Sequence, residues 1–184
     1  PPPRSTLFPY TTLFRSTEIM LLRRGRMVAA HSLRIGTVRI EQHLNPDAGI
    51  YSNIEGYIRE NMRNMGEILD AEFRLSRIKY FVAVGGDARL AAEKVGTKIH
   101  KHYAVIQRKA FLDFLARLQK LTLDECVGML QVTYNEAEGL VPALLLYKHF
   151  LESTSADSLL VPDVSLREGV ILSFALDEIG RAHV

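Results

Sequence analysis

The sequence predicts a single α/β domain in which helices flank a mixed β-sheet. Strand-like and helix-like segments alternate along the chain, which is typical of layered α/β domains. One segment, Tyr80–Val84, is continuously apolar and rich in β-forming residues, as in a strand covered on both faces of a parallel sheet. Residue pairs with the spacing of capping boxes precede three helical segments. These pairs are Ser52/Glu55, Thr122/Glu125 and Ser165/Glu168.

The two ends of the chain are set apart from this domain. Residues 6–16 read TLFPYTTLFRS, a translation of a common sequencing adapter, and residues 179–184 read IGRAHV, a translation of its partner. We therefore expect 1–16 and 179–184 to be adapter-derived or non-native, and 17–178 to be the informative domain of a longer protein cut at both ends. The ends contain three arginines and no acid, so this domain is close to neutral although the whole chain has a formal charge of +2.

Composition excludes several classes of protein. A nearly neutral domain loses the basic character that predicts nucleic-acid binding. The longest apolar stretch is Leu140–Tyr147, far short of the ~20 residues that a membrane span needs, so neither nucleic acid nor a membrane is an expected partner. The single cysteine, Cys126, excludes an internal disulfide framework and fits a reducing compartment such as a bacterial cytoplasm.

The N-terminal elements are a predicted hairpin and a long helix. Thr17–Leu22 and Met27–Leu33 read as two strands around a turn that contains Gly25, and a third strand is predicted over 36–41. From Ser52 onward, apolar residues recur every three or four positions, which indicates an amphipathic helix. Its apolar stripe is Ile54, Ile58, Met62, Met65, Leu69 and Phe73.

The later elements follow from the same patterns. The segment 140–151 reads as a strongly apolar helix whose stripe fits the core better than a dimer face, and Pro142 is tolerable only near its first turn. The other predicted helices cover 87–95, 109–119, a short segment after Thr122, and 165–176, and the other predicted strands cover Tyr80–Val84, 103–107 and 158–161.

Gly85 and Gly86 form the first candidate site, where the apolar strand ends and a helix begins. Glycines let backbone amides approach a ligand, and a helix N-terminus favours anions such as phosphate. A tight strand-to-helix turn needs the same glycines, and Asp87 would repel an anion. On spacing alone the turn is the favoured interpretation, because a short glycine motif is weak evidence.

The remaining candidates read as ordinary residues on composition alone. Thr17 and Glu18 place a hydroxyl beside a carboxylate that could position water or a metal, but an exposed glutamate at a strand end is common. The histidines lack zinc-like spacing to any cysteine or carboxylate. The arginines at 23, 24 and 26 could meet a polyanion, although a solvated turn is the default interpretation.

A family resemblance favours a functional interpretation of some of these candidates. The segment Ala156–Val170 resembles the exopolyphosphatase / guanosine pentaphosphate phosphohydrolase (Ppx/GppA) family, which has the motif S-D-x-G-L-R-E-G after a strand. The matching residues are Asp163, Leu166, Arg167, Glu168 and Gly169, and the departures are Pro162 and Ser165.

Three further segments resemble the same family in the same order. Thr17-Glu18 followed by Ser32–Ile40 resembles the end of D-x-G-G-G-S-T-E followed by S-L-P-L-G-x-V-R-L. Gly85–Arg89 resembles a G-G-T-A-R loop, with Asp87 in the threonine position. Glu136–Ala143 resembles R-A-D-x-x-x-P-G, with Glu136 replacing the arginine and reversing its charge.

The resemblance implies the second ribonuclease H-like domain of the actin-like ATPase (ASKHA) superfamily, truncated so that it lacks its first strand. It implies hydrolysis of a terminal phosphoanhydride of polyphosphate or guanosine pentaphosphate, with Mg²⁺ as cofactor, in a cleft between two domains. By position, Glu18 is the candidate catalytic carboxylate, and Thr17, Gly85 and Gly86 are candidate phosphate-binding residues. No metal ligand set is assigned, and a homodimer is plausible for the full-length parent.

Two consequences and two alternatives follow. The parent is expected to be an enzyme and this piece of it inactive, because a missing central strand leaves backbone groups unpaired. Residues 7–15 are rich in β-forming residues and are a hypothetical substitute for that strand, although Pro9 argues against it. The alternatives are a nucleotide-binding module of another actin-like ATPase or sugar-kinase-like protein, and a non-catalytic partner-binding relative.

Overall fold

The computed structural model describes residues 17–33, 56–60, 63, 67, 69–70 and 74–164. The predicted strand at 36–41, the helix at 165–176, two of the capping boxes and the hypothesis for residues 7–15 lie outside the described residues. Helical backbone at 56–60, 63, 67 and 69–70 confirms parts of the first predicted helix. Two residues of its apolar stripe, Ile58 and Leu69, are buried.

The N-terminal hairpin is confirmed. Strand β1 (Thr17–Arg23) pairs antiparallel with β2 (Arg26–Leu33). The two residues between them, Arg24 and Gly25, have φ angles of 53° and 76°. Left-handed backbone at both central positions is the geometry of a type I′ turn, whose twist matches that of the strands.

The second sheet is mixed and has four strands in the order β3-β6-β5-β4. Strand β3 runs parallel to β6, whereas β5 is antiparallel to both of its neighbours. The prediction missed β4, whose polar sequence TKIH lacks a strand-like apolar pattern. The bounds are β3 (Phe81–Val82), β4 (Thr97–His100), β5 (Tyr103–Gln107) and β6 (Ser158–Pro162).

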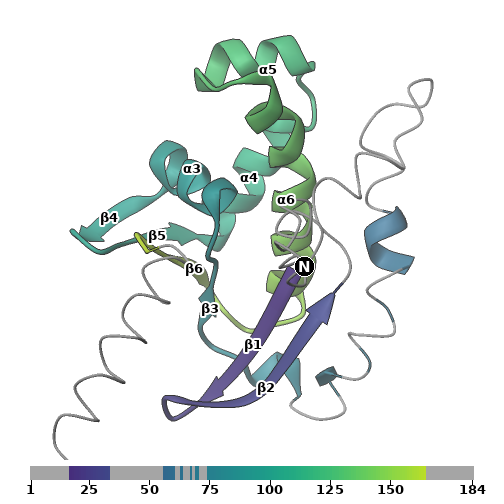
Figure 1. The fold of residues 1–184 in the computed structure, drawn as a ribbon, viewed down its shortest axis with the longest axis vertical. Coiled ribbons are helices and arrows are strands. Elements are labelled where there is room, and N and C mark those ends of the chain that lie inside the picture. Colours follow the sequence, from purple (N-terminus) through teal and green to yellow (C-terminus); the bar gives the residue numbers. More distant parts are fainter. Residues whose placement is uncertain are drawn as a thin grey trace, which may run out of the picture.

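Helices cover one side of this sheet, and α6 runs through the middle of the molecule (Figure 1). The capping box at Thr122 and Glu125 is confirmed: each residue's side chain accepts a hydrogen bond from the other's backbone amide. The helical elements are the 3₁₀ turn η2 (Leu75–Arg77), α3 (Gly86–Val95), α4 (Arg108–Leu118), α5 (Leu123–Leu130) and α6 (Tyr134–Glu152).

The core lies among helices α3–α6 and one face of the four-stranded sheet. Leu144 of α6, Phe111 of α4 and Ile106 of β5 are all fully buried in one hydrophobic cluster. The apolar stripe of α6 is therefore core, as the sequence predicted. Ile19 of the hairpin packs against this cluster and is only partly buried.

The prediction for the start of α6 was wrong. The helix begins at Tyr134, so Pro142 lies in its interior and not in its first turn. A second capping box, between Thr133 and Glu136, starts the helix before the apolar run that the prediction relied on. Pro142 removes one helical N–H donor, and the surrounding buried apolar residues hold the helix together across that gap.

The prediction that Tyr80–Val84 is covered on both faces was also wrong. Ala83 is 1% exposed, but Val82 and Val84 are 57% and 55% exposed. The segment is buried on one face only, because the helices α3, α4 and α6 lie on the side of the sheet to which Ala83 contributes. The continuous apolar run therefore indicated a strand correctly, but it did not indicate that only one face of this strand is covered by other described parts of the protein.

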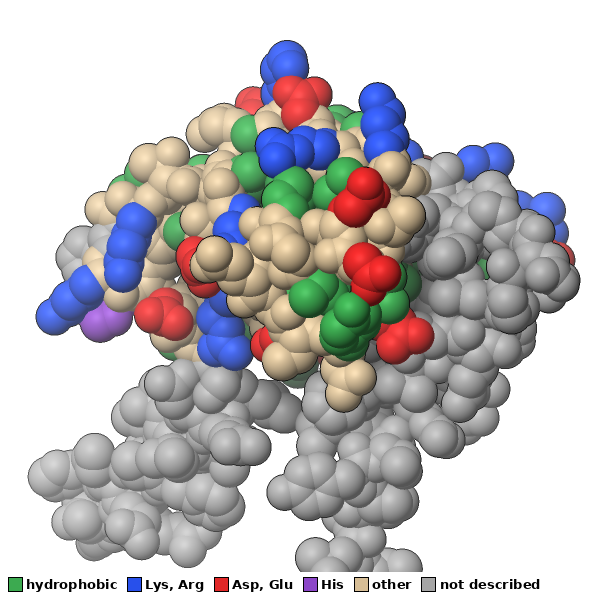
Figure 2. Space-filling model, turned by 90° about the horizontal axis from the view of Figure 1, so that it is seen from above, with side chains coloured by type: hydrophobic (Ala, Val, Ile, Leu, Met, Phe, Trp, Pro, Cys, Tyr) green, Lys and Arg blue, Asp and Glu red, His purple; other side chains and the backbone are tan. Residues whose placement is uncertain are grey.

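The outer surface carries charges of both signs. Figure 2 shows acidic and basic side chains interspersed on the face that carries α5. Among the described residues, no helix combines the length and apolarity needed to cross a bilayer.

Candidate functional site

Glu18 lies at the start of β1, where its side chain is exposed. The Ser32 hydroxyl on β2 donates a hydrogen bond to Glu18 Oε1 at 2.8 Å. Thr17 precedes it as the first residue of the strand. The structure thus presents the predicted carboxylate to solvent at a strand end and gives it one defined partner that the sequence prediction missed.

A register shift in the hairpin creates this pairing. Close to the turn, Leu22 pairs with Met27. The next residue of β1, Leu21, pairs with Ala29, so Val28 has no partner residue on β1. One unpaired residue on one strand is the pattern of a β-bulge. As a result Glu18 lies opposite Ser32.

His31 lies on the other face of the hairpin. Its neighbour across the ladder is Ile19, and both side chains are partly buried. The Nε2 atom of His31 is buried and has no hydrogen-bond partner among the described residues. Without the register shift, a two-residue turn would place His31 opposite Glu18 in the place of Ser32.

Gly85 and Gly86 connect β3 to α3, as predicted. Gly85 is the N-cap residue of α3, and its carbonyl accepts a hydrogen bond from the Arg89 amide at 3.1 Å. A Cβ added at Gly85 would lie 3.0 Å from the hydroxyl oxygen of Tyr147, a residue of α6, whereas a Cβ at Gly86 would meet nothing within 4 Å. A methyl group at Gly85 would therefore crowd the Tyr147 hydroxyl, whereas Gly86 has open space beside it.

Asp87 and Tyr147 make the electrostatics of this loop unusual. Burial raises the pKa of Asp87 from 3.8 to about 6, its own backbone amide opposes the rise through a hydrogen bond, and the charge of Glu136 adds to it. Burial, together with the charge of Asp87, raises the pKa of Tyr147 to about 12. At neutral pH the loop therefore has a protonated phenol and a carboxylate that is costly to ionise.

Glu136, which replaces the arginine of the family motif, has a structural function here. Its carboxylate Oε2 accepts hydrogen bonds from the amide and the hydroxyl of Thr133, both at 2.8 Å. These bonds hold the pKa of Glu136 below its usual value. The charge reversal at this position therefore coincides with a helix cap at the start of α6.

The predicted site residues fall into two groups on two sheets. Thr17 and Glu18 begin β1 in the hairpin, and Gly85 and Gly86 follow β3 in the four-stranded sheet. Among the described residues no strand ladder joins these sheets. Both groups lie beside the core around α6. Tyr147 of α6 lies next to Gly85, and Ile19, the neighbour of Glu18 in β1, packs against the same core.

The described residues contain no cluster of three or more His, Cys, Asp or Glu side chains suited to a metal. Glu18 is an exposed carboxylate with one oxygen, Oε1, bonded to Ser32. Mg²⁺ commonly uses one or two carboxylates together with waters and substrate phosphates. A magnesium ion beside Glu18 would therefore take most of its ligands from water and from substrate phosphates.

Sequence comparison decides the family. The profile of the Ppx/GppA phosphatase family matches residues 15–178, which is most of the chain. The chain belongs to the Ppx/GppA phosphatase family. The membership that the motifs predicted is confirmed. The search of curated proteins found no match to this Ppx/GppA chain.

Solved Ppx/GppA structures share the fold. An exopolyphosphatase from Cytophaga hutchinsonii aligns with a TM-score of 0.71 at 18% identity, covering 88% of this chain and 54% of that protein. The Aquifex aeolicus family member aligns with a TM-score of 0.66 at 22% identity, covering 89% of this chain and 54% of that protein. The type II variant of the Aquifex aeolicus phosphatase gives 0.63 at 22% identity, with 86% and 53% covered.

Three facts follow for this Ppx/GppA chain. Its fold is the α/β, ribonuclease H-like fold of the actin-like ATPase superfamily, with a mixed sheet and flanking helices. The chain spans about half the length of the solved relatives that it matches. The family is one of phosphatases. One of the solved relatives is named as an exopolyphosphatase.

Proposed function

We propose that this chain forms one half of a phosphatase that hydrolyses the terminal phosphoanhydride of inorganic polyphosphate or guanosine pentaphosphate. The observation that supports this most directly is the family match over residues 15–178. Within this range, the candidate carboxylate of Glu18 is exposed at the start of β1. Phosphoryl transfer depends mainly on positioning and on neutralising charge, which needs few residues in defined places.

In this proposal each site residue has a separate function. The Glu18 carboxylate accepts a hydrogen bond from the attacking water and orients its lone pair toward the terminal phosphorus. Thr17 lies at the edge of the phosphate-binding turn, and the amides of Gly85 and Gly86 donate to phosphate oxygens at the start of α3. Mg²⁺, when bound, would neutralise phosphate charge, and Glu18 would hold it through water, so that the carboxylate stays available to the attacking water.

Asp87 makes the glycine loop a weaker anion site than the family motif. A carboxylate in the first turn of α3 opposes a phosphate at the neighbouring amides. The raised pKa of Asp87 reduces that opposition below about pH 6, where the side chain becomes neutral. We therefore expect Asp87→Thr, which restores the threonine of the motif, to lower KM for polyphosphate at pH 8 more than at pH 5.

The chain by itself is expected to be inactive, since it spans only about half of its solved relatives. The first experiment is to sequence the source DNA upstream of the Thr17 codon and to express the complete protein. The proposal expects a D-x-G-G-G-S motif directly before Thr17. If the upstream codons lack that glycine loop, the phosphatase function is wrong for this chain and a nucleotide-binding or non-catalytic function replaces it.

The second experiment measures phosphate release by the complete protein from polyphosphate and from guanosine pentaphosphate, with Mg²⁺. Glu18→Gln keeps the size of the side chain but removes its charge, and we expect kcat to fall about 100-fold or more. Glu60→Gln is the matched control, because Glu60 is also exposed and lies on the helical segment 56–60. Equal activity of the two variants would remove Glu18 from the proposed site.

A further inference from the structure

We infer that Ser32 is a positioning residue, which holds the carboxylate of Glu18 in the orientation that catalysis needs. The inference rests on the proposed function of Glu18. The observation behind it is the 2.8 Å hydrogen bond from the Ser32 hydroxyl to Glu18 Oε1, between two exposed side chains on neighbouring strands.

The hydrogen bond selects one of the two carboxylate oxygens. Ser32 occupies Oε1, and among the described residues no side chain or amide bonds to Oε2. A free glutamate on a strand end samples many rotamers, because it has three rotatable side-chain bonds. A hydrogen bond to Oε1 restricts the rotamers of the side chain and so narrows the range of directions that Oε2 can take, which is what a group that orients water requires.

The β-bulge in the hairpin makes this contact possible. The two-residue turn Arg24–Gly25 alone would place His31 opposite Glu18, and the extra residue Val28 shifts the register by one. The shift moves His31 to the inner face and brings Ser32 to the outer face, opposite Glu18. Bulges are frequent beside active sites because they re-aim side chains in this way.

An ordinary cross-strand pair is the competing explanation. Side chains directly opposite each other in a hairpin often hydrogen-bond and contribute only to stability. The two explanations differ in what the loss of the hydroxyl changes. A structural pair affects the unfolding midpoint, whereas a positioning residue affects kcat and acts only when the carboxylate is present.

The experiment compares Ser32→Ala, Ser32→Thr and Glu18→Gln in the complete protein, alone and combined. We expect Ser32→Ala to lower kcat for polyphosphate hydrolysis about tenfold, with KM within twofold and the thermal midpoint unchanged. Ser32→Thr keeps a γ-hydroxyl and suits a strand, so it should restore kcat. In the Glu18→Gln background, Ser32→Ala should change kcat less than twofold, because the carboxylate it positions is gone.

Three results would overturn the inference. Wild-type kinetics for Ser32→Ala beside an inactive Glu18→Gln would reject Ser32 and leave the proposed function intact. A loss of kcat that is equal in both backgrounds, or that accompanies a lower thermal midpoint and is not restored by threonine, would show a structural role. Full activity of Glu18→Gln would reject the proposed function itself, and the inference about Ser32 with it.

Discussion

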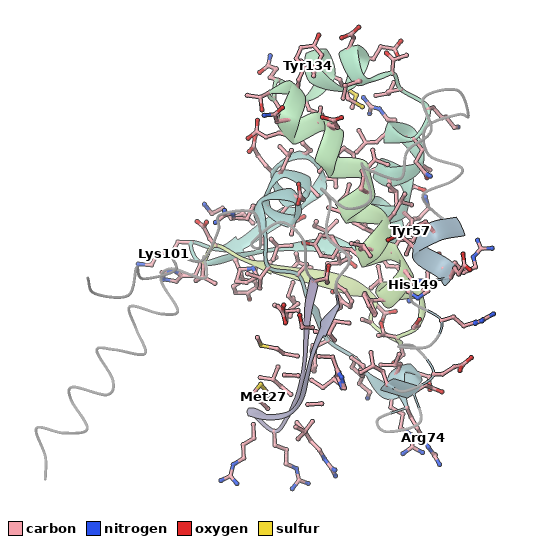
Figure 3. All side chains as sticks on the ribbon, turned by 45° about the vertical axis from the view of Figure 1, so that its right-hand side comes forward. Met27, Tyr57, Arg74, Lys101, Tyr134 and His149 are labelled. Atoms are coloured by element: carbon pink, nitrogen blue, oxygen red, sulfur yellow. The ribbon has the colours of Figure 1, made fainter. Side chains whose placement is uncertain are left out.

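The hairpin and the region around α6 are both rich in apolar residues, but they use them differently. In the hairpin, Met20, Leu22 and Met27 are 59%, 67% and 63% exposed. In α6, an unbroken run of residues from Leu140 to Leu146 is buried. Figure 3 shows Met27 at the free end of the hairpin, away from the helices.

The two regions are therefore stabilised by different interactions. The hairpin is held by its ladder and its turn, with Ile19 as its contact to the core, whereas α6 is held by the burial of its side chains. Burial is the larger free-energy term, so most of the stability comes from the region around α6, whereas the proposed chemistry uses residues of both regions. Glu18 belongs to the first part, and Gly85, which contacts Tyr147 of α6, belongs to the second.

The largest expected effect comes from removing the same side chain in each region. Leu144→Ala leaves a cavity beside fully buried neighbours and should lower the free energy of unfolding by about 3 kcal/mol. Leu22→Ala removes an exposed side chain and should change it by less than about 0.5 kcal/mol. Urea denaturation measures both. Similar losses in the two variants would contradict the division between the regions.

The next largest effect concerns Asp87, whose pKa is about 6 in the folded chain and 3.8 in the unfolded chain. The folded state binds the proton more tightly, so the group's contribution to stability is complete below about pH 4 and is lost as pH rises to about 6. Asp87→Asn should therefore stabilise the protein by about 2 kcal/mol at pH 7, allowing for its partial exposure, and by much less at pH 4. Denaturation of both proteins across this range tests it, and a pH-independent difference would show that burial of the charge is not the cause.

A smaller effect tests the contact between α6 and the glycine loop. A methyl group at Gly85 meets the Tyr147 hydroxyl at 3.0 Å, so Gly85→Ala should lower the free energy of unfolding by about 1 kcal/mol. Gly86→Ala is the matched control and should change it by less than about 0.5 kcal/mol, because its added methyl meets open space. Tyr147→Phe removes the hydroxyl and should reduce the cost of Gly85→Ala. If the cost persists in that background, the contact with Tyr147 is not its cause.

The smallest expected effect lies in the hairpin turn. Arg24 has a φ of 53°, a conformation that asparagine adopts more easily than arginine. Arg24→Asn should raise the free energy of unfolding by about 0.5 kcal/mol. Arg23→Asn is the control, because Arg23 is a strand residue and gains nothing from this preference. A hairpin whose order came from packing would respond equally to both substitutions, and thermal denaturation would show it.

Local patterns predicted most of the described elements because those patterns act locally. The turn at Arg24–Gly25 and the capping box at Thr122 and Glu125 need only residues close in sequence. The buried residues of α4, such as Phe111 and Leu115, followed from helical periodicity. The polar strand β4 was missed because it is stabilised by its ladder with β5 and not by its own apolar pattern.

The functions of Glu18 and of the glycine pair remain predictions from the motif resemblance. That resemblance did not indicate which residues lie beside them in the structure. Ser32 faces Glu18 only because of the bulge at Val28, and Tyr147 reaches Gly85 across more than 60 positions of sequence. A count of residues along a hairpin does not reveal a bulge, since the hydrogen-bond ladder alone decides which residue is left unpaired.

The sequence by itself therefore determined the family and most of the described elements, and it suggested candidate residues for phosphate chemistry, because propensities, caps and motifs depend on neighbours in the chain. Only the tertiary structure decided that the apolar segment at Tyr80–Val84 has one exposed face, that Glu136 caps α6, and that Ser32 pairs with Glu18. The physical reason is that exposure and cross-strand partners are set by segments distant in sequence, whose approach is decided by packing.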